Sequence, residues 1–216
     1  MKKILLVLLV LMATLGAVGL WWRWASRRRQ LPCPSWLAWI LDNPLTETVA
    51  GTQTTLDRIG LQPGEHGLDV GSGPGRLTIP AAQRVGPTGT VVAFDIQPQM
   101  LARLQEKVAV AGITNVVPQL GDITANNNLS SDTFNRAWLV TGLGEIPDRM
   151  AALHNLYRVL KPGGTLSITE IFPDPHYQTR ATVLDLCQAA GFEPAHYWGT
   201  PLAFTQNFMK PTSRAL

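Results

Sequence analysis

The sequence predicts an α/β fold with a mostly parallel sheet that has helices on both faces. From Gly64 onward, apolar strands alternate with amphipathic helices, which is the pattern of a parallel sheet covered on both sides. A glycine-rich turn joins the first of these strands to the helix that follows it. Near the end of the chain, two apolar segments follow each other with no room for a helix between them. We therefore expect an antiparallel pair at one edge of the sheet.

Each element is predicted from its local pattern. The expected strands are the apolar runs at 67–70, 90–94, 115–120, 135–140, 165–172, 193–198 and 203–209. The expected helices are the segments at 46–59, 76–85, 98–111, 148–160 and 179–190. Gly191 follows the last helix as its C-cap, and the Pro162-Gly163-Gly164 sequence forms the turn before the fifth strand.

The charge of the chain is unevenly distributed. Of the 216 residues, 18 are basic and 15 are acidic, but six of the basic residues lie within 1–41, which contains no acid. The 12 basic residues that remain are outnumbered by the 15 acids, so residues 42–216 have a net charge of −3. A nucleic-acid-binding protein needs a basic face. The charge of the globular part therefore argues against a nucleic-acid partner.

The cysteines and histidines form no pattern of metal ligands. Cys33 and Cys187 are isolated, and no two of the four histidines are four residues apart. Zinc sites need ligands at short spacings, and a disulfide framework needs several paired cysteines. We expect no metal site, no disulfide framework, and a buried core position for Cys187.

Residues 4–22 form an almost unbroken apolar run without a charged residue. About 20 helical residues span the hydrocarbon core of a bilayer, so this run predicts one transmembrane helix. Tryptophans and four arginines follow the run, and this larger positive charge places the globular part in the cytoplasm as a single-pass membrane protein. A cleaved signal peptide is the alternative, because Ala17-Val18-Gly19 resembles a cleavage site, although the run is long for one.

The chain therefore divides into three predicted parts. Residues 1–29 are the transmembrane anchor with its basic flank, 30–62 are a linker with a helical cover, and 63–216 are the globular domain. An apolar cluster at 36–41 within the linker packs either on the domain or on the bilayer.

The strongest motif is Asp69-Val70-Gly71-Ser72-Gly73-Pro74-Gly75-Arg76, in which a strand ends, a glycine-rich turn follows and a helix begins. Gly71 and Gly73 permit backbone conformations closed to other residues and leave room for a ligand. The start of the helix offers free N–H groups and the positive end of the helix dipole. The G-x-G-x-G spacing differs from the G-x-G-x-x-G of dinucleotide-binding enzymes. The Asp69 carboxylate would repel a diphosphate but attract a cationic amino acid or a sulfonium.

Two further acids follow later strands. Asp95 ends the second strand about 20 residues after the glycine turn, where an acid accepts hydrogen bonds from both hydroxyls of a ribose. Asp122, after Gly121, can accept a hydrogen bond from the exocyclic amine of adenine. Three apolar side chains could sandwich the adenine ring: Ile96, Met100 and Ile123.

Each acid also has a purely structural interpretation. Asp69 and Asp95 could be ordinary turn residues at strand ends, and Asp122 could be a helix N-cap.

Four features in this order resemble the sequence signature of class I S-adenosylmethionine (SAM)-dependent methyltransferases. The nearest type is that of the small-molecule methyltransferases of ubiquinone and menaquinone biosynthesis. The features are the segment 68–75, Asp95, the Gly121-Asp122 pair and the segment 158–164. The resemblance covers about residues 50–209. It implies a Rossmann-like, seven-stranded sheet in the order 3-2-1-4-5-7-6, with the last strand antiparallel.

The resemblance implies SAM as the cofactor. The glycine turn would contact its methionine part, Asp95 its ribose and Asp122 its adenine. Thirteen residues are predicted to bind the cofactor: Asp69, Gly71, Ser72, Gly73, Pro74, Gly75, Asp95, Ile96, Met100, Gly121, Asp122, Ile123 and Val140.

The predicted catalytic residue is Glu145, the acid nearest the end of the fourth strand. It could touch the methyl acceptor or act as a general base, or it could begin a helix beside Pro147. Glu170 and His176, near the end of the fifth strand, are second candidates.

The predicted reaction is methyl transfer to a small-molecule or lipid-like acceptor. The methyl group of SAM is already activated, so the enzyme mainly has to hold a nucleophile against it. A membrane anchor at 4–22 would favour lipid-soluble acceptors and make the membrane a partner. Two alternatives remain: an NAD(P)-dependent oxidoreductase, which the spacing of the glycine turn disfavours, and an inactive scaffold anchored to the membrane.

Overall fold

The structure is a computed structural model of the chain that describes residues 14, 17, 51–125, 128–172 and 174–212. Nearly all of the predicted anchor at 4–22 and most of the predicted linker lie outside these residues. Within the described part of the chain, no helix is both long and apolar enough to cross a membrane. This finding corrects the prediction of a single-pass membrane protein with a cytoplasmic domain, which rested on run length and flanking charge alone.

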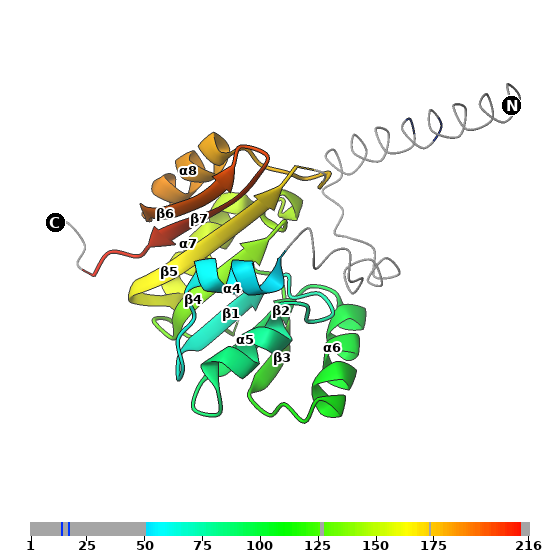
Figure 1. The fold of residues 1–216 in the computed structure, drawn as a ribbon. Coiled ribbons are helices and arrows are strands. Elements are labelled where there is room, and N and C mark those ends of the chain that lie inside the picture. Colours follow the sequence, from blue (N-terminus) through cyan, green and yellow to red (C-terminus); the bar gives the residue numbers. More distant parts are fainter. Residues whose placement is uncertain (1–13, 15–16, 18–50, 126–127, 173, 213–216) are drawn as a thin grey trace, which may run out of the picture.

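Seven strands form one sheet in the order β3-β2-β1-β4-β5-β7-β6. Their bounds are β1 His66–Val70, β2 Thr90–Asp95, β3 Val116–Leu120, β4 Phe134–Val140, β5 Leu160–Ile171, β6 Glu193–Thr200 and β7 Ala203–Met209. The first five strands pair in parallel, and β7 is antiparallel to both β5 and β6. The predicted strand order and the antiparallel last strand are confirmed (Figure 1).

Helices cover both faces of the sheet (Figure 1). They are α4 Thr52–Ile59, α5 Thr78–Val85, α6 Pro98–Val110, α7 Arg149–Val159 and α8 Arg180–Ala189. On one face, Leu56 of α4 and Leu104 of α6 pack with Trp138 of β4. On the other face, Leu153 of α7 and Cys187 of α8 belong to a second apolar core. Burial raises the pKa of the Cys187 thiol to about 12, so this cysteine is the core residue that the sequence predicts.

Three elements begin more than one residue from their predicted start. α4 begins at Thr52 and not at residue 46, because Gly51 before it has a φ of +49° and is the N-cap. α5 begins at Thr78, because the turn after Gly75, whose φ is +90°, continues through Leu77. β5 begins at Leu160, because the predicted turn at 162–164 pairs with the chain at the end of β7 and so lies within the strand. There, the Gly163 N–H donates to the Lys210 carbonyl, and the Lys210 N–H donates to the Gly164 carbonyl.

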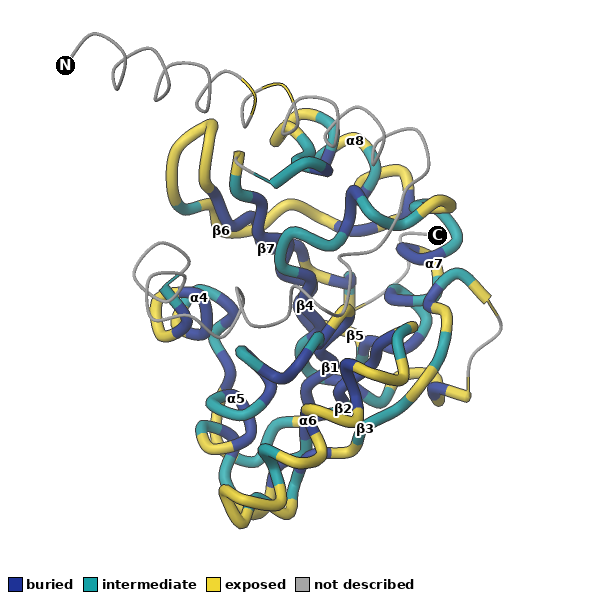
Figure 2. The backbone as a smooth tube through the Cα atoms, turned by 90° about the vertical axis from the view of Figure 1, so that its right-hand side faces the viewer, coloured by how far each residue is buried: buried dark blue, intermediate teal, exposed yellow. Residues whose placement is uncertain are grey.

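Burial along the sheet shows where a ligand can be enclosed. The central strands β1, β4 and β5 are largely buried, whereas the edge strand β6 is exposed along almost its whole length (Figure 2). The strand order reverses between β1 and β4, with β2 and β3 on one side and β5 on the other. Open α/β sheets bind ligands at the carboxyl ends of the strands beside such a reversal.

Candidate cofactor and active site

A cavity of about 320 Å³ lies at the carboxyl ends of β1, β2 and β4. Twelve of the thirteen predicted cofactor-binding residues line it, as does Glu145; Gly75 does not. Eleven further residues that were not predicted from the sequence also line it, and most of them adjoin a predicted residue: Val70, Arg76, Leu77, Phe94, Gln97, Leu139, Thr141, Gly142, Ile146, Pro147 and Asp174. The fold thus brings five separate parts of the sequence to one cavity, whereas the motif at 158–164 does not line it.

The glycine turn forms the wall of the cavity next to β1. Gly71 and Gly73 have φ values of +72° and +54°, in the region that L side chains rarely adopt. A Cβ atom added to Gly71 would meet no protein atom within 4 Å. The N–H groups of Gly71 and Ser72 both donate to the Phe94 carbonyl, at 2.8 and 3.3 Å. These bonds hold the turn against β2, and the space beside Gly71 is part of the cavity.

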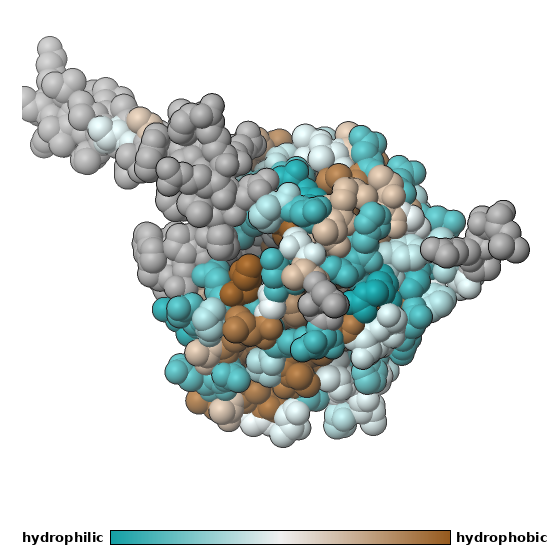
Figure 3. Space-filling view, turned by 180° about the vertical axis from the view of Figure 1, so that it is seen from behind, coloured by the Kyte–Doolittle hydropathy of each residue, from teal (hydrophilic) through white to brown (hydrophobic). Residues whose placement is uncertain are grey.

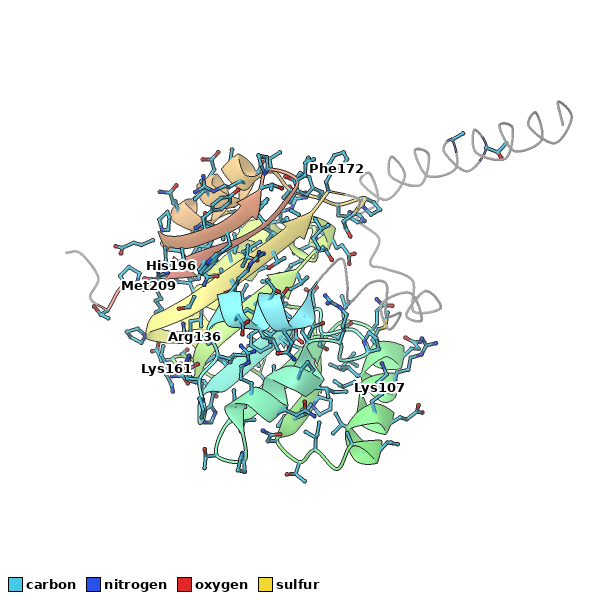
Figure 4. The ribbon with its side chains drawn as sticks, in the orientation of Figure 1. Lys107, Arg136, Lys161, Phe172, His196 and Met209 are labelled. Carbon is cyan, nitrogen blue, oxygen red and sulfur yellow. The ribbon has the colours of Figure 1, made fainter. Side chains whose placement is uncertain are left out.

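Gly75 supports the turn from outside the cavity. A Cβ atom at this position would lie 2.3 Å from Cδ1 of Leu104 on α6. Lys107 comes from the same helix (Figure 4), and its Nζ donates to the carbonyl of Pro74 at 3.1 Å. Gly75 therefore allows α6 to pack closely against the turn, a structural task that its place in the motif does not reveal.

Asp69 is a buried acid in the cavity wall. Its Oδ2 accepts a hydrogen bond of 2.7 Å from the hydroxyl of Thr78 at the start of α5. Burial raises the pKa of Asp69 to about 7, although the Thr78 bond and the nearby Arg76 guanidinium lower it. A carboxyl group with such a pKa, facing a cavity, gains most from pairing with a cation.

Asp95 is fixed at the end of β2 by two backbone donors. Its Oδ2 accepts from the Gly73 N–H and its Oδ1 from the Gln97 N–H, both at 2.8 Å. Burial raises the pKa of this carboxyl group, and the backbone hydrogen bonds partly offset that effect. A carboxylate oxygen can accept two hydrogen bonds. Each oxygen of Asp95 therefore retains the capacity to accept from a ligand hydroxyl.

Asp122 lines the cavity and begins a turn at 123–125, so it is not the helix N-cap of its structural alternative. Its Oδ1 accepts from both the N–H and the hydroxyl of Thr124, each at 2.8 Å. Its Oδ2 accepts no hydrogen bond from the part of the chain that the structure describes. The preceding Gly121 is required for packing, because a Cβ atom there would lie 2.6 Å from Cζ of Phe94.

Apolar side chains line the cavity next to these acids. Met100 and Ile123 are buried, whereas Ile96 is 56% exposed. Seen from behind, apolar surface gathers on the lower half of the molecule, which holds β2, β3 and α6 (Figure 3). The exposed large apolar residues of that half are Ile96, Val110, Val117 and Leu120. Of these, Ile96 alone lines the cavity, where a planar ring could cover it.

The far end of the cavity is formed by the residues after β4. Thr141 has a φ of +54°, and its N–H still donates to the Thr169 carbonyl of β5 at 2.8 Å. Glu145 ends the short 3-10 helix η2, Leu143–Glu145. The alternative role predicted for Glu145 was to begin a helix. Asp148 has this role instead, because its Oδ1 caps α7 by accepting from the Ala151 N–H at 2.9 Å.

The second candidates, Glu170 and His176, lie outside the cavity. Glu170 is 1% exposed near the end of β5, and burial raises its pKa to about 8. His176 lines a separate small pocket together with Arg149 and Gln178. In the described ranges, no group of three or more His, Cys, Asp or Glu residues could hold a metal ion.

Comparisons with known proteins agree with this geometry. Residues 68–164 match the family described as "Methyltransferase domain". The ubiquinone/menaquinone biosynthesis C-methyltransferase UbiE of Marinomonas sp. (strain MWYL1) is 34% identical over 131 residues, which cover 61% of this chain and 52% of that protein. The demethylmenaquinone methyltransferase of Geobacillus sp. (strain WCH70) is 35% identical over 118 residues, covering 55% of this chain and 50% of that protein.

This chain carries, at residues 68–164, a methyltransferase domain of the kind found in class I SAM-dependent methyltransferases. Its fold is also that of a SAM-dependent methyltransferase from Aquifex aeolicus, with a TM-score of 0.76 and 24% identity over 82% of this chain and 98% of the other. The chain spans about half the length of the curated relatives it matches. These matches support the predicted enzyme class and SAM as the cofactor, and none of them favours an oxidoreductase.

The cavity of the methyltransferase domain fits SAM on structural grounds. The Ser72 hydroxyl is buried and has no hydrogen-bond partner in the part of the chain that the structure describes. A buried polar group without a partner is costly, so a ligand that bonds to it is favoured. Asp69 offers a carboxylate for the ammonium or sulfonium of SAM, and Asp95 can accept hydrogen bonds from both ribose hydroxyls. The individual assignments of these residues to parts of SAM remain predictions.

Proposed function

We propose that this chain transfers the methyl group of SAM to a carbon atom of a quinol-type small molecule. The observation that carries the proposal is the extent of the cavity. It continues past the predicted cofactor residues to a region walled by Thr141, Glu145, Ile146 and Asp174. We infer that the acceptor binds in this region, beside the cofactor site. The relatives named for quinone biosynthesis support an acceptor of this class.

The walls of this region combine apolar surface with acids. Ile146 and Pro147 offer apolar contact to an aromatic ring, while Glu145 and Asp174 can accept hydrogen bonds from hydroxyl groups. The two carboxylates would repel an acceptor that carries a phosphate or carboxylate. A neutral ring with hydroxyl groups therefore suits this end of the cavity.

The proposed chemistry needs a base and a held acceptor. SAM supplies a methyl group on a positively charged sulfur, which is activated for direct displacement. Glu145 accepts the proton of an acceptor hydroxyl, which makes the neighbouring ring carbon nucleophilic. That carbon bonds to the methyl group as the sulfur–methyl bond breaks, which leaves neutral S-adenosylhomocysteine. The ring carbon then loses its own proton to water, which restores the aromatic ring, and Glu145 returns its proton to the ring oxygen. The walls of the cavity hold the ring at reacting distance.

The test is transfer of label from methyl-labelled SAM to a short-chain demethylmenaquinol, kept reduced. Phosphoethanolamine serves as the comparison acceptor. Label in the quinol fraction, on carbon by mass spectrometry, is the expected result. Label in phosphoethanolamine alone would overturn the quinol proposal, and label in neither acceptor would also count against it.

Glu145→Gln tests the role of the base. We expect kcat to fall by roughly 10²- to 10⁴-fold, the usual contribution of a positioned acid or base, with an unchanged dissociation constant for SAM. Glu106→Gln, at an exposed position on α6 away from the cavity, is the matched control. Full activity of Glu145→Gln would exclude Glu145 as the base.

A further inference from the structure

The acceptor end of the cavity depends on a contact between two backbone segments. A Cβ atom added to Gly144 would lie 1.9 Å from the carbonyl oxygen of His176, so the turn at 143–145 and the segment 174–178 touch directly. Asp174, the first residue of this segment, and Glu145, in the turn, both line the cavity. The position of the segment 174–178 therefore sets the shape of the acceptor wall.

The segment 174–178 is tied internally and to its surroundings. The His176 N–H donates to Oδ1 of Asp174 at 2.7 Å, and Nε2 of Gln178 donates to the His176 carbonyl at 2.6 Å. On its outer side, the Tyr177 hydroxyl donates to the Pro201 carbonyl. On its inner side, the Gln178 N–H donates to Oε2 of Glu170 at 3.0 Å. Glu170 is thus the side chain of the central sheet that holds this segment.

Glu170 has an unusual environment for an acid. It is 1% exposed, and its Oε1 has no hydrogen-bond partner in the described part of the chain. An ionised carboxylate at such a place carries a large desolvation cost, whereas a neutral carboxylic acid carries a much smaller one. Burial accordingly raises its pKa to about 8.

The charges around Glu170 come from several elements. Asp174 in the segment and Glu145 in η2 repel its ionised form, while Arg149 at the start of α7 stabilises it. Arg149 also donates to the carbonyls of Leu143 and Gly144 at 3.2 and 3.3 Å. Burial and the Glu170 carboxyl group both raise the pKa of Tyr177. An ionised Glu170 would therefore add a third negative charge behind the two acids of the acceptor end.

We propose that Glu170 is a positioning residue for the acceptor end of the cavity. As a neutral acid it holds the segment 174–178 against the turn at 143–145. The ionised form would accept the Gln178 N–H more strongly, but the cost of the buried charge and its repulsion by Asp174 and Glu145 outweigh that gain. Ionisation therefore releases the segment. Release lets water reach the carboxylate, since the segment is its cover on the Gln178 side. Glu170 acts through Gln178 and Asp174 and does not itself line the cavity. The effect on turnover rests on the proposed function, whereas the effect on the segment does not.

The test is amide hydrogen exchange of the peptide that covers 172–180, corrected for intrinsic exchange rates, in the full chain at pH 7 and pH 9. With a pKa of about 8, the neutral fraction of Glu170 falls from about nine tenths to about one tenth between these values. The wild-type peptide should therefore lose about tenfold in protection. Glu170→Gln, a permanently neutral isostere, should keep its protection at both pH values.

Two further variants complete the comparison. Glu170→Ala should show low protection at both pH values, because the bond to the Gln178 N–H is gone. Glu193→Gln, which changes an exposed acid at the start of β6, should behave as wild type. S-adenosylhomocysteine affinity, measured by calorimetry, establishes that each variant is folded. If Glu170→Ala does not fold, the comparison of wild type with Glu170→Gln still tests the proposal. An identical pH response of these two proteins would overturn the proposal.

Kinetics with the demethylmenaquinol probe separate this proposal from the proposed function. The wild-type kcat/KM for the quinol should fall about tenfold from pH 7 to pH 9, and that of Glu170→Gln should not fall. A loss that lies in KM for the quinol, measured at saturating SAM, indicates positioning of the acceptor wall. Exchange results as expected, without any methylation of the quinol, would support the positioning role and contradict the acceptor. Methylation of the quinol without the exchange difference would support the acceptor and contradict the positioning role.

Discussion

The backbone N–H of Gly73 donates a hydrogen bond of 2.8 Å to the carboxylate of Asp95. This bond joins the glycine turn after β1 to the acid that ends β2, although 22 residues separate them. The same carboxylate lines the cavity and can accept from ligand hydroxyls. Asp95 therefore both shapes the turn and is available to a ribose.

Asp95→Asn should weaken SAM binding by about 30- to 100-fold. The amide has one acceptor oxygen, so it loses either the Gly73 or the Gln97 hydrogen bond as well as its charge. Hydrogen bonds to charged groups contribute roughly 2–3 kcal/mol, which corresponds to this loss. Titration calorimetry with SAM measures it. Asp57→Asn, at a position whose side chain is 69% exposed, is the control and should bind normally. Wild-type affinity of Asp95→Asn would show that the acid does not contact the cofactor.

The affinity for SAM should rise with pH through the titration of Asp69. In the free protein its pKa is about 7, because burial disfavours the charged form. A bound ammonium or sulfonium favours the carboxylate, so binding below this pKa releases a proton. The ionised fraction rises from about one tenth at pH 6 to about nine tenths at pH 8, which predicts about a tenfold gain in affinity.

The measurement for Asp69 is calorimetry in buffers of different ionisation enthalpy, which reports the protons released on binding. Asp69→Asn should release none and show a flat pH profile, with weaker binding at pH 8. A wild-type affinity that does not change between pH 6 and pH 8 would contradict the pairing of Asp69 with a cation.

Much of the site follows from the sequence because of a property of parallel sheets. The carboxyl ends of neighbouring parallel strands meet at one edge, so motifs at successive strand ends must converge. The positions of Asp69, Asp95 and Asp122 along the chain are therefore sufficient to predict that they surround one cavity. The order of the motifs then identifies which strand ends take part.

Other features depend on contacts that no local pattern records. The hydrogen bond from Gln178 to Glu170 exists because the segment after β5 turns back over Gly144. The positive φ of Thr141 has no signal in the residue type, since threonine disfavours it. Gly75 has a place in a ligand-binding motif, yet its role is to admit Leu104 of α6. The contacts of Gly144 with His176 and of Gly75 with Leu104 join residues that are distant in sequence, and the fold alone brings them together.

Gly71→Ala should weaken SAM binding by more than its loss of stability explains. Gly71 and Gly112 have φ values of +72° and +64°, and a Cβ atom at either would meet nothing within 4 Å. Both alanine variants should therefore lose about 1–2 kcal/mol from the same backbone strain. Only Gly71 lines the cavity, so its new methyl group would occupy ligand space.

Thermal denaturation and SAM titration together separate strain from obstruction. Gly112→Ala should bind SAM as wild type despite its lower melting temperature. Gly75→Ala should be less stable than either, because its Cβ atom adds a clash at 2.3 Å with Leu104 to the strain. If Gly71→Ala and Gly112→Ala bound SAM equally well, the space beside Gly71 would not belong to the cofactor.

Thr141→Asn should raise the melting temperature by about 2–4 °C. Thr141 is a β-branched residue with a φ of +54°, a conformation that costs roughly 1 kcal/mol or more and that asparagine tolerates better. For a domain of this size, about 1 kcal/mol shifts the midpoint by this amount. The N–H that bonds to the Thr169 carbonyl is retained in the variant. Thr114→Asn, at an exposed threonine without a positive φ, should leave the midpoint unchanged and is the control.

The activity of Thr141→Asn then tests whether the backbone strain at Thr141 has a functional role. Strained residues persist where the surrounding structure holds them, and they concentrate at functional sites. Thr141 lines the acceptor end of the cavity, so a relaxed residue there should let the wall shift. We expect kcat/KM for the demethylmenaquinol probe to fall while SAM affinity is retained. If Thr141→Asn is more stable and equally active, the strained conformation serves only the β4–β5 connection. If it is less stable, the threonine side chain itself holds the turn.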